Sequence, residues 1–586
     1  MNKKDLILNI LLFISQIIVF YYFFCYLFPF KEQLQMFQFT SQYLTETLKQ
    51  AGGVAIYISE FLSQFYVVFW TGPIISALLL TLVALLSSLI LKKINSRNDL
   101  PLIFLLPWLS LLIISLDYDY YEQGTIAYLF LLLFLWLYTN IKTRIKFIYG
   151  ICIIPILYGI AGPIVHLFAI SALFFEFLTN GKKKYINIIY LLIAALSAIA
   201  GTYLGYSRNL TLAFLPEAYC NPLQTVSGIY YAWYALPMTM LLVAYLKRYK
   251  EPVSLKGKCI WEGAQWAIMF LLVYQGIFHF GKLDAQHSMK QDYLLRTEQW
   301  DLVISEFNHD VLSKRRMCGL NLALAHKGQL SERLLDYPQH GIETLMLHWD
   351  QSIYTAQLHS DLYYCMGIIS AAQKFAFEAF VSSRSSGNPR MLKRLIETNL
   401  ITGSYPIADK YIQLLEKTWF YKDWATAHRR FLYNDKAVEE DKILGMKRRC
   451  WKAEASAAKL YTDPVSSLIN LLPACPDNKA GLAYLTSFLL LNKDIETYKT
   501  LQESLYRSPA WRDMTECQQE AIVICSPNDP HFWLEHGVSI KVRNRAIAFM
   551  QKVQDISRSG QNPAVALASE YGKTYWYYYM FNMMDK

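Results

Sequence analysis

Residues 259–282 read CIWEGAQWAIMFLLVYQGIFHFGK, and this stretch ends the apolar part of the chain. It contains the last of nine apolar segments, most of which approach the roughly 20 residues that an α-helix needs to cross a bilayer. From Lys282 to Lys586 the sequence instead mixes polar and apolar residues at helical spacing. The sequence therefore predicts an all-α protein with a polytopic transmembrane domain at 1–281 and a water-exposed helical domain at 282–586.

The nine apolar segments are predicted to be membrane spans, and the first of them is followed by a long outer loop at 29–65. Lys3 and Lys4 precede the first segment, which lacks the small-residue cleavage site of a signal peptide and is expected to remain as a helix. The fifth and sixth segments are short and are separated only by Ala161-Gly162-Pro163. The predicted spans are 7–28, 66–91, 100–116, 124–141, 147–161, 163–179, 185–205, 228–246 and 259–280.

The distribution of Lys and Arg predicts the orientation, because these residues concentrate in cytoplasmic loops. With nine spans, 16 basic residues lie on one side and three, Lys31, Lys49 and Arg208, on the other. A single span at 147–179 would move 182–184 to the second side, so a hairpin is favoured. Glu176, near a cytoplasmic end, is expected to pair with a lysine there. The 16 residues are Lys3, Lys4, Lys92, Lys93, Arg97, Lys142, Arg144, Lys146, Lys182, Lys183, Lys184, Lys247, Arg248, Lys250, Lys256 and Lys258.

This orientation predicts a protein of the bacterial inner membrane, in contact with lipid, with a cytoplasmic N-terminus and a periplasmic second domain. The formal charge of +10 comes largely from the cytoplasmic loops, so it does not indicate nucleic-acid binding. The second domain holds six cysteines at irregular spacing, without a metal-ligand pattern. Disulfides are possible in an oxidising compartment, but separate buried thiols are the favoured interpretation. The six are Cys318, Cys365, Cys450, Cys475, Cys517 and Cys525.

A short pattern recurs in the second domain. It has a turn residue, a large apolar residue two positions on, and a small residue three positions further. Gly367-x-Ile369-x-x-Ala372 is followed 36 residues later by Gly403-x-Tyr405-x-x-Ala408. Such a pattern is typical of paired antiparallel helices, in which the turn residue ends the first helix and the small residue lets the helices approach. Weaker copies are Glu298-x-Trp300-x-x-Val303, Gly328-x-Leu330 and the turn at Asn492-Lys493-Asp494-Ile495.

The recurring pattern resembles the tetratricopeptide repeat, over about 290–510. The resemblance implies an α-solenoid whose concave face binds an extended peptide or another protein. Two basic stretches in this region, Arg384 to Arg394 and Lys447 to Arg449, are expected to be solvated faces, with an acidic-ligand site as the alternative. The aromatic run from Tyr575 to Phe581 either folds back on the repeats or touches the membrane.

Several stretches resemble an uncharacterised family of multi-pass membrane proteins of Bacteroidetes. The resemblance covers nearly the whole chain and implies no particular activity. The stretches that carry it are Gly52-Gly53-Val54-Ala55-Ile56-Tyr57 through Glu60-Phe61, Gly328-Gln329-Leu330, and Leu392-Lys393-Arg394-Leu395-Ile396-Glu397-Thr398-Asn399-Leu400.

Candidate chemistry gathers on the predicted outer side of the membrane. Asp117-Tyr118-Asp119 ends the third span, and two carboxylates at this spacing can converge on a divalent cation. Arg208, the only basic residue of the 205–227 loop, suits phosphate contact. His166 lies inside the sixth span, where an ionisable group indicates function. In the first outer loop, Glu60 lies in an expected amphipathic helix, with Gly52-Gly53 separating it from an earlier helix at about 34–49.

This outline loosely resembles the multi-pass glycosyltransferases that use polyprenyl-linked sugars. By that resemblance Glu60 is the base, with Glu32 and Glu46 as alternatives in the same loop, and Asp117 and Asp119 are catalytic residues that bind a metal or orient the acceptor. Arg208 and His166 are the expected substrate-binding residues. A divalent cation would then neutralise the lipid phosphate that leaves. Acids that merely cap a helix at the membrane surface are the simpler interpretation of the Asp pair.

Two functions remain open. One is an enzyme that moves sugar from a polyprenyl-linked donor to an extracytoplasmic acceptor held by the repeats. The other is a non-catalytic envelope scaffold that recruits proteins through the repeats. The sequence has no phosphate-binding glycine loop, zinc-ligand spacing or nucleophile elbow to decide between them.

Overall fold

The computed structural model describes residues 3–97, 100, 102–180, 185–221, 226, 228–249, 254–306, 313–384, 387–456, 463–527 and 529–582. These residues form helices and turns without a β-strand, which confirms the all-α class. The chain divides into two compact units, Met1–Met289 with Thr418–Phe420, and Lys290–Lys417 with Tyr421–Lys586. The main boundary falls inside one helix, α14 (Leu283–Arg296), close to the predicted domain border.

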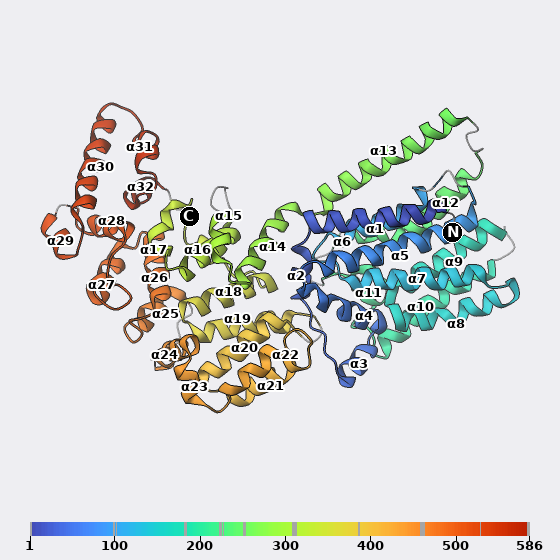
Figure 1. Ribbon diagram of the computed structural model, residues 1–586, viewed down its shortest axis with the longest axis horizontal. Helices are drawn as coiled ribbons and strands as arrows, with labels where there is room; N and C mark the ends of the chain where they lie inside the picture. Colours follow the sequence, from blue (N-terminus) through green and yellow to red (C-terminus); the bar gives the residue numbers. More distant parts are fainter. Residues whose placement is uncertain are drawn as a thin grey trace. The chain divides into compact units, whose positions relative to one another are not determined.

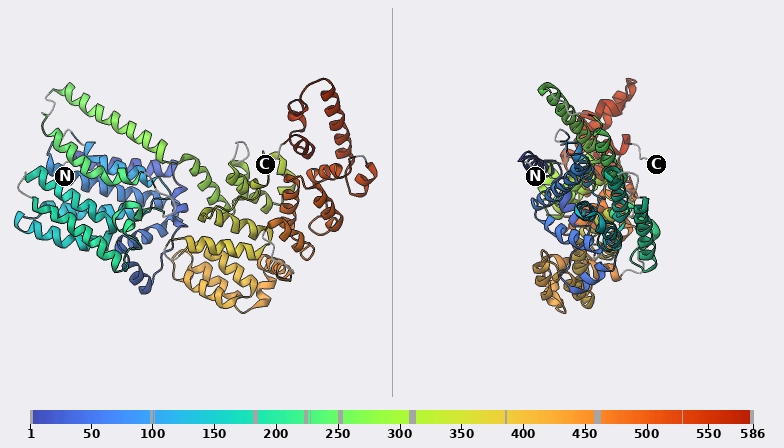
Figure 2. Two further views of the ribbon diagram at one scale, coloured as in Figure 1. Left: turned by 180° about the vertical axis from the view of Figure 1, so that it is seen from behind. Right: turned by 90° about the vertical axis from the view of Figure 1, so that its right-hand side faces the viewer.

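The first unit is a bundle in which the long helices run side by side (Figures 1 and 2). Helix α5 packs on α1 and α7, and α8 packs on α7 and α10. Each of the nine predicted segments overlaps at least one helix of this unit. The helices are α1 (Lys3–Phe23), α2 (Leu27–Glu32), α3 (Ser41–Leu48), α4 (Gly53–Ser63), α5 (Thr71–Ile94), α6 (Leu106–Ser115), α7 (Glu122–Asn140), α8 (Thr143–Ala161), α9 (Val165–Asn180), α10 (Ile189–Tyr203), α11 (Leu210–Phe214), α12 (Ile229–Leu246) and α13 (Leu255–Phe280).

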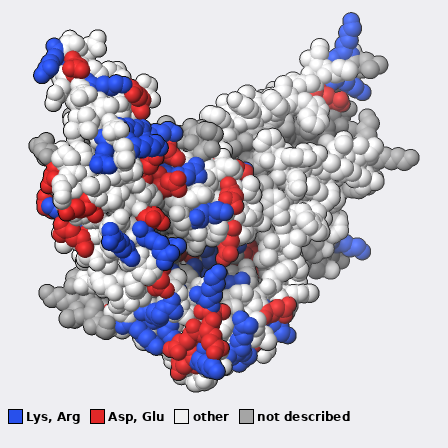
Figure 3. Space-filling model, turned by 60° about the vertical axis from the view of Figure 1, so that its left-hand side comes forward, with Lys and Arg blue, Asp and Glu red and all other residues white. Residues whose placement is uncertain are grey.

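Within the ranges that the structure describes, apolar helices long enough to cross a membrane lie in the first unit, and α13 is followed after a bend by α14. Among the described residues there are five by length and composition, or six if the bent pair Lys256–Phe280 and Leu283–Arg296 counts as one span. Large apolar side chains remain exposed on α1, α10 and α13. In the face drawn in Figure 3, charged side chains crowd one part of the surface and are sparse over another. These features support membrane association.

The longest apolar stretch, Ile145–Thr179, is one of these five and comprises most of α8 and α9. Gly162 adopts a φ of 81° and ends α8, and α9 then runs back. Lys146 Nζ near the start of α8 lies 2.9 Å from Glu176 Oε1 near the end of α9. The predicted hairpin and the predicted pairing of Glu176 with a lysine are therefore both observed. Lys182–Lys184 and Lys250, which the orientation argument counts, lie outside the described residues.

The tip of this hairpin is held by polar contacts from other parts of the first unit. The Tyr219 hydroxyl accepts a hydrogen bond from the Ile164 N–H (3.0 Å) and donates to the Ala161 carbonyl (2.6 Å). The break therefore leaves few backbone groups unsatisfied, as an apolar environment requires.

Gly52 separates α3 from α4, as the sequence predicts, and also approaches the hairpin tip. Its φ of 78° is left-handed, and its N–H lies 3.2 Å from the Tyr158 carbonyl and 3.1 Å from that of Gly159. A Cβ at Gly52 would lie 3.0 Å from the Ala161 carbonyl carbon, so no side chain fits without movement. The first of the two predicted helices is shorter than expected, because α3 begins only at Ser41, where Thr40 caps it.

The second unit is built from shorter helices, most of which pack on their neighbours in sequence. They are α15 (Trp300–Glu306), α16 (Lys314–His326), α17 (Leu330–Arg333), α18 (Ile353–Met366), α19 (Ile369–Ser382), α20 (Pro389–Thr402), α21 (Tyr405–Glu416), α22 (Lys422–His428), α23 (Asp435–Glu440), α24 (Lys442–Ser456), α25 (Pro464–Leu471), α26 (Lys479–Leu491), α27 (Ile495–Leu505), α28 (Glu516–Cys525), α29 (Pro530–Glu535), α30 (Ile540–Arg558), α31 (Pro563–Tyr571) and α32 (Tyr575–Phe581).

Every copy of the recurring pattern is a turn between two helices, and its turn residue is left-handed. The φ angles are 58° at Glu298, 70° at Gly328, 89° at Gly367, 75° at Gly403 and 55° at Lys493. In each copy the next N–H donates to the carbonyl five residues earlier, at 2.8–2.9 Å. This is the six-to-one hydrogen bond of a Schellman motif, which ends a helix by satisfying its last carbonyls. The pattern thus specifies five local helix ends.

The C-terminal aromatic run folds back on the second unit. Glu520 of α28 accepts a hydrogen bond from the Tyr575 N–H (2.6 Å), and its carbonyl accepts one from Trp576 Nε1 (3.0 Å). Tyr575 and Trp576 are buried. Burial raises the pKa of Glu520 to about 7, against the hydrogen bond from Tyr575 and the charge of Arg545.

Candidate functional site

The predicted acidic pair lies in the turn between α6 and α7, and both side chains are buried. Asp117 is 4% exposed and Asp119 is 0% exposed. The Asp119 N–H donates to Asp117 Oδ1 at 3.0 Å, which fixes the turn. Asn221 holds Asp119 twice: its side-chain amide donates to Asp119 Oδ1 (3.0 Å), and its N–H donates to the Asp119 carbonyl (2.8 Å). The turn after the third predicted span and the 205–227 loop therefore meet at this pair.

Lys282 faces both carboxylates, and no pattern in the sequence indicates this contact. Its Nζ lies 2.9 Å from Asp117 Oδ1 and 3.3 Å from Asp119 Oδ2. The same Nζ lies 4.4 Å from the centroid of the Tyr118 ring. Burial would lower the pKa of Lys282, but the hydrogen bond and charge of Asp117, helped by Asp119, leave that pKa raised. The ammonium group is therefore held charged between the two acids.

Lys282 also marks a bend in the chain. Its φ is 42°, and α13 and α14 meet there at an angle of 57°. A left-handed conformation is unfavourable for a residue with a side chain and persists only where the surroundings hold it. The ion pair with Asp117 and Asp119 is the contact that can hold this residue.

A second lysine approaches the same turn from α2. Lys31 is 7% exposed, and its Nζ donates to the Ser115 carbonyl at 3.0 Å. Burial lowers the pKa of Lys31, although the charges of Glu122, Asp117 and Asp119 oppose that effect. Burial raises the pKa of Asp119, against Asn221 and Lys282. Asp117, Asp119, Asn221, Lys31 and Lys282 together are termed the acidic-turn cluster.

The other predicted site residues are placed differently. Glu60 is 1% exposed on α4, which packs on α7 and α8. The His166 ring stacks on Phe214, with centroids 4.8 Å apart, and so meets the 205–227 loop. Arg208 is exposed in that loop, and within the described part of the chain it forms no hydrogen bond or ion pair. The structure brings Asp117 and Asp119 together, and neither Arg208 nor His166 contacts them.

The fit of a divalent cation to the Asp pair can be judged from these contacts. Such ions take six or more oxygen ligands, whereas both carboxylates here face an ammonium group. No group of three or more His, Cys, Asp or Glu side chains arranged to hold a metal occurs among the described residues. A cation would have to displace Lys282, so the residues present do not fit one in this arrangement. The metal role of Asp117 and Asp119 stays a prediction.

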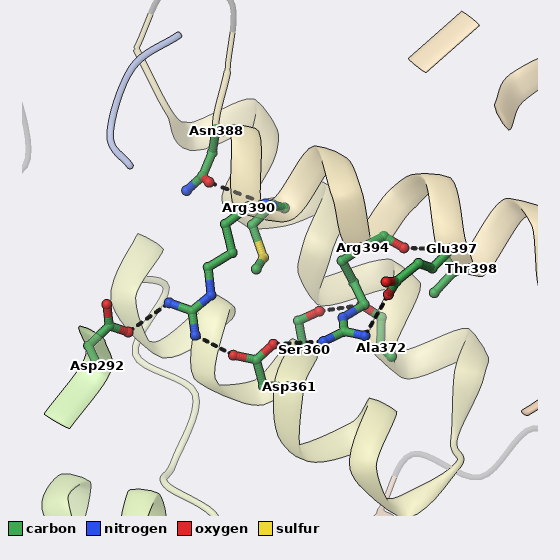
Figure 4. A network of polar contacts seen from close by, with 10 residues as sticks. Asp292, Ser360, Asp361, Ala372, Asn388, Arg390, Arg394, Glu397 and Thr398 are labelled. Carbon is green, nitrogen blue, oxygen red and sulfur yellow. Dashed lines mark hydrogen bonds and ion pairs between the residues drawn. The ribbon is translucent and has the colours of Figure 1, made fainter. Parts of the chain in front are cut away.

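A second polar network lies in the second unit (Figure 4). Arg390 Nη1 lies 2.7 Å from Asp292 Oδ1, and its other Nη contacts Asp361. Arg394 Nη2 lies 3.1 Å from Asp361 Oδ1, and its Nη1 lies 2.8 Å from Glu397 Oε2. Burial would raise the pKa of Asp361, but the two guanidinium groups hold it below its usual value. The network joins α14, α18 and α20.

The two basic stretches were expected to be solvated faces, and this expectation is wrong for several residues. Lys447 and Arg448 are 5% and 4% exposed and donate to backbone carbonyls, including those of Cys365 and Leu400. Arg449 is exposed, as expected. The last carbonyls of α18 and α20 have no partner within their own helices, so they can accept these hydrogen bonds. The sequence alone does not show which distant lysine or arginine reaches them.

The structure thus defines an all-helical protein in which apolar helices of one unit surround a buried ion-paired turn, joined to a second unit of helix pairs. The family model that matches it is described as "Family of unknown function (DUF6057)" and covers residues 2–582. The chain belongs to this family. No match to the chain is found among curated proteins or solved structures.

Proposed function

We propose that the protein is a membrane-embedded anchor that holds a partner-binding helical unit on the periplasmic side of a bacterial inner membrane. In this proposal the chain crosses the membrane nine times, its N-terminus is cytoplasmic, and residues 282–586 lie on the periplasmic side. The helix in each of the nine apolar segments, the α8–α9 hairpin and the predicted loop charges support this orientation.

We further propose that the helix pairs of the second unit form a tetratricopeptide-like solenoid. Five Schellman turns at corresponding positions of the pattern support this proposal. Stacked helix pairs present an extended surface that suits a peptide segment of a partner protein. Phe377 and Val381, one turn apart on α19, are 48% and 54% exposed and provide an apolar contact of this kind.

One observation carries the anchor function: Lys282 occupies the space between Asp117 and Asp119. Lys282 lies where α13 passes into α14, the helix through which the chain enters the second unit. Carboxylates engaged in this way stabilise a bend, and a metal or an acceptor hydroxyl would have to displace Lys282 to reach them. The acidic-turn cluster then fixes the first turn of the exit helix to the bundle.

A complementation experiment in a deletion strain tests this function. A photo-crosslinking residue at position 381 of the full chain is expected to give a discrete adduct, and a Phe377→Asp substitution should abolish it. Asp119→Asn, at equal protein abundance, should leave the adduct in place. The same crosslinker at Val565, which is 76% exposed, serves as the matched control. An adduct that resists Phe377→Asp, or appears equally at 565, contradicts the anchor function.

The glycosyltransferase-like enzyme is the second candidate, and the buried charges favour it. Ionisable groups surrounded by apolar helices are costly and are commonly retained for function. In that function Glu60 acts as base, Asp117 and Asp119 orient the acceptor, Arg208 and His166 bind a polyprenyl-linked sugar, and the second unit holds the acceptor. Envelope glycan profiles of the deletion strain, Asp119→Asn and Glu60→Gln test it. Loss of one glycan in all three strains, with folded protein present, supports the enzyme.

A further inference from the structure

The end of α10 is fixed beside the end of α3 in the first unit. Gly205, which follows α10, has a φ of 79°, a left-handed conformation that glycine favours. This turn lets the Tyr206 N–H donate to the Gly201 carbonyl at 2.8 Å. The Tyr206 carbonyl then accepts a hydrogen bond at 2.9 Å from the N–H of Ala51, three residues after the end of α3. Two segments that are far apart in sequence are therefore joined at this point.

The end of α8 lies at the same point. The Gly52 N–H, next to Ala51, lies 3.2 Å from the Tyr158 carbonyl of α8. The Tyr158 ring occupies the space that a Cβ at Gly201 of α10 would fill, so Gly201 allows α8 and α10 to approach closely. The ends of three helices therefore form one corner of the bundle. The name three-helix corner is used for residues 48–52, 156–159 and 201–208.

Large apolar and aromatic side chains are exposed at the three-helix corner. Tyr203 and Leu204 are 93% and 68% exposed, and Leu48, Ile156 and Tyr206 are exposed as well. Tyrosine is common where a membrane span meets the lipid headgroups. Tyr203 also ends a stripe of exposed apolar residues on α10, whose spacing of three or four residues places them on one helix face. The others in this stripe are Ile189, Leu192, Leu196 and Ile199.

Two positive charges lie beside these apolar side chains. Lys49 follows Leu48 directly, and Arg208 lies two residues after Tyr206. Both side chains are exposed, and neither forms a hydrogen bond or an ion pair with the residues that the structure describes. Lys31, the third basic residue of the predicted outer loops, is buried. The two exposed cations of these loops are therefore both at the three-helix corner.

One acid lies close to Lys49 in sequence. Glu46 of α3 accepts a hydrogen bond from Gln42 at 2.9 Å. Among the described residues it forms an ion pair with neither Lys49 nor Arg208. The charges of the two cations are therefore not neutralised by an ion pair within the described part of the chain.

We propose that the three-helix corner binds an anionic glycerophospholipid, whose phosphate is held by Lys49 and Arg208 and whose acyl chains lie on the exposed face of α10. A phosphate accepts hydrogen bonds from an ammonium group and a bidentate pair from a guanidinium group. A soluble anion needs only the two charges, whereas exposed Tyr203 and Leu204 fit a ligand that also carries acyl chains. The inference rests on the proposed function, since only a membrane-spanning first unit places this corner at the lipid headgroups.

Native mass spectrometry of the delipidated full-length protein in neutral detergent tests the proposal, with dioleoylphosphatidylglycerol as the probe. Lys49→Gln combined with Arg208→Gln should weaken binding about 25-fold, since each cation near an anionic lipid contributes about fivefold. Lys256→Gln combined with Lys258→Gln is the matched control, because it removes two exposed cations of the same unit from the opposite predicted side, and should leave the affinity unchanged. Dioleoylphosphatidylcholine, whose headgroup has no net charge, should bind the wild type and both variants alike.

Three results would overturn the proposal. One is equal affinity of the wild type and the Lys49→Gln, Arg208→Gln variant for the anionic lipid. A second is an equal loss in the control variant, which would show unspecific attraction of charge. The third is tighter binding of a polyprenyl phosphate than of the phosphatidylglycerol, which would assign the corner to another lipid. Binding in detergent does not depend on topology, so a missing adduct at position 381 with intact lipid binding would contradict the anchor function alone.

Discussion

Lys146 and Glu176 lie 30 residues apart in the chain, and their charged atoms lie 2.9 Å apart. The side chains are 11% and 1% exposed, so the ion pair is almost fully removed from solvent. Because Lys146 lies near the start of α8 and Glu176 near the end of α9, their contact requires the apolar stretch between them to reverse direction. The ends of the stretch therefore lie on one side of the bundle.

The hairpin predicts the accessibility of two connecting segments. Epitope tags inserted after Ile141 and after Gly181 should both be reached by antibody only in permeabilised cells. A tag after Ser207, in the exposed loop beyond α10, should be reached in intact spheroplasts. A tag at 181 that is accessible from outside, with the one at 141 protected, would show that the stretch crosses only once.

Removing the ammonium group of Lys282 should destabilise the bend at α13 and α14. In Lys282→Met, Asp119 remains fully buried beside Asp117 without the cation that balances them. We expect a loss of about 2 kcal/mol, lower than for a fully buried pair because Lys282 is 36% exposed. The unfolding midpoint of the full-length protein in detergent measures it.

Two further variants make this prediction specific. Lys290→Met removes a half-buried partner of Glu306, a carboxylate that is itself 35% exposed and so keeps its solvation, and should cost less than about 1 kcal/mol. Asp119→Asn combined with Lys282→Met should recover part of the loss, since coupled residues are not additive. Strictly additive effects of the two substitutions would contradict a structural role for the ion pair.

Asp361 is the central acceptor of the network in the second unit, because Arg390 and Arg394 both bind it. Asp361→Asn should lower the free energy of unfolding by about 3 kcal/mol, since two guanidinium groups lose their shared counter-charge. Denaturant unfolding followed by tryptophan fluorescence measures the change. Asp477→Asn, in an exposed pair with Arg449, is the matched control and should change the stability by less than about 1 kcal/mol. Equal losses of stability in Asp361→Asn and Asp477→Asn would contradict the central role of Asp361 in the network.

Glu520 should make the docking of α32 depend on pH. Its folded pKa of about 7 lies above the ordinary value of 4.5, so the folded state binds a proton more tightly than the unfolded state. The stabilisation is therefore complete below pH 4.5 and is lost as the pH rises towards and through 7, by about 3 kcal/mol in all. Hydrogen exchange of the 575–581 amides, corrected for intrinsic rates, should show more protection at pH 5 than at pH 8.

Glu520→Gln keeps the hydrogen-bond acceptor and removes the titration. This variant should show equal protection at both pH values. Glu535→Gln, at an exposed position of α29, should behave as the wild type. A pH dependence that survives in Glu520→Gln would show that another group is responsible.

Local features were predictable from the sequence, and long-range ones were not. Gly52, Gly162, Gly367 and Gly403 mark helix ends because a left-handed turn favours glycine at the position itself. Asp117 and Asp119 were predictable as a pair because they lie only two positions apart in the sequence. Their partner Lys282 lies 165 residues from Asp117, and only packing of α13 beside α6 brings it there.

The basic stretches show the same limit. Arg390 and Arg394 are one helical turn apart, and charge alone indicates an exposed face. Their burial depends on Asp361 and Asp292, which come from two other helices. From the sequence, Lys31 is only a basic residue of an outer loop, whereas in the structure its ammonium group donates a hydrogen bond to the Ser115 carbonyl. A turn can be predicted from a single residue, whereas an ion pair can be predicted only when the positions of both partners are known.

The five Schellman turns bear on how this protein can be made more robust in the laboratory. Three use glycine at the left-handed position, whereas Glu298 and Lys493 adopt that conformation with a full side chain. Lys493 has a second task, because its Nζ binds the Tyr579 carbonyl at 2.9 Å. Glu298 is exposed, and replacing it with glycine relieves a conformation that disfavours other residues by about 1 kcal/mol. A thermostabilised form for structural work can therefore start from Glu298→Gly, because Glu298 is exposed and forms no ion pair with the residues that the structure describes.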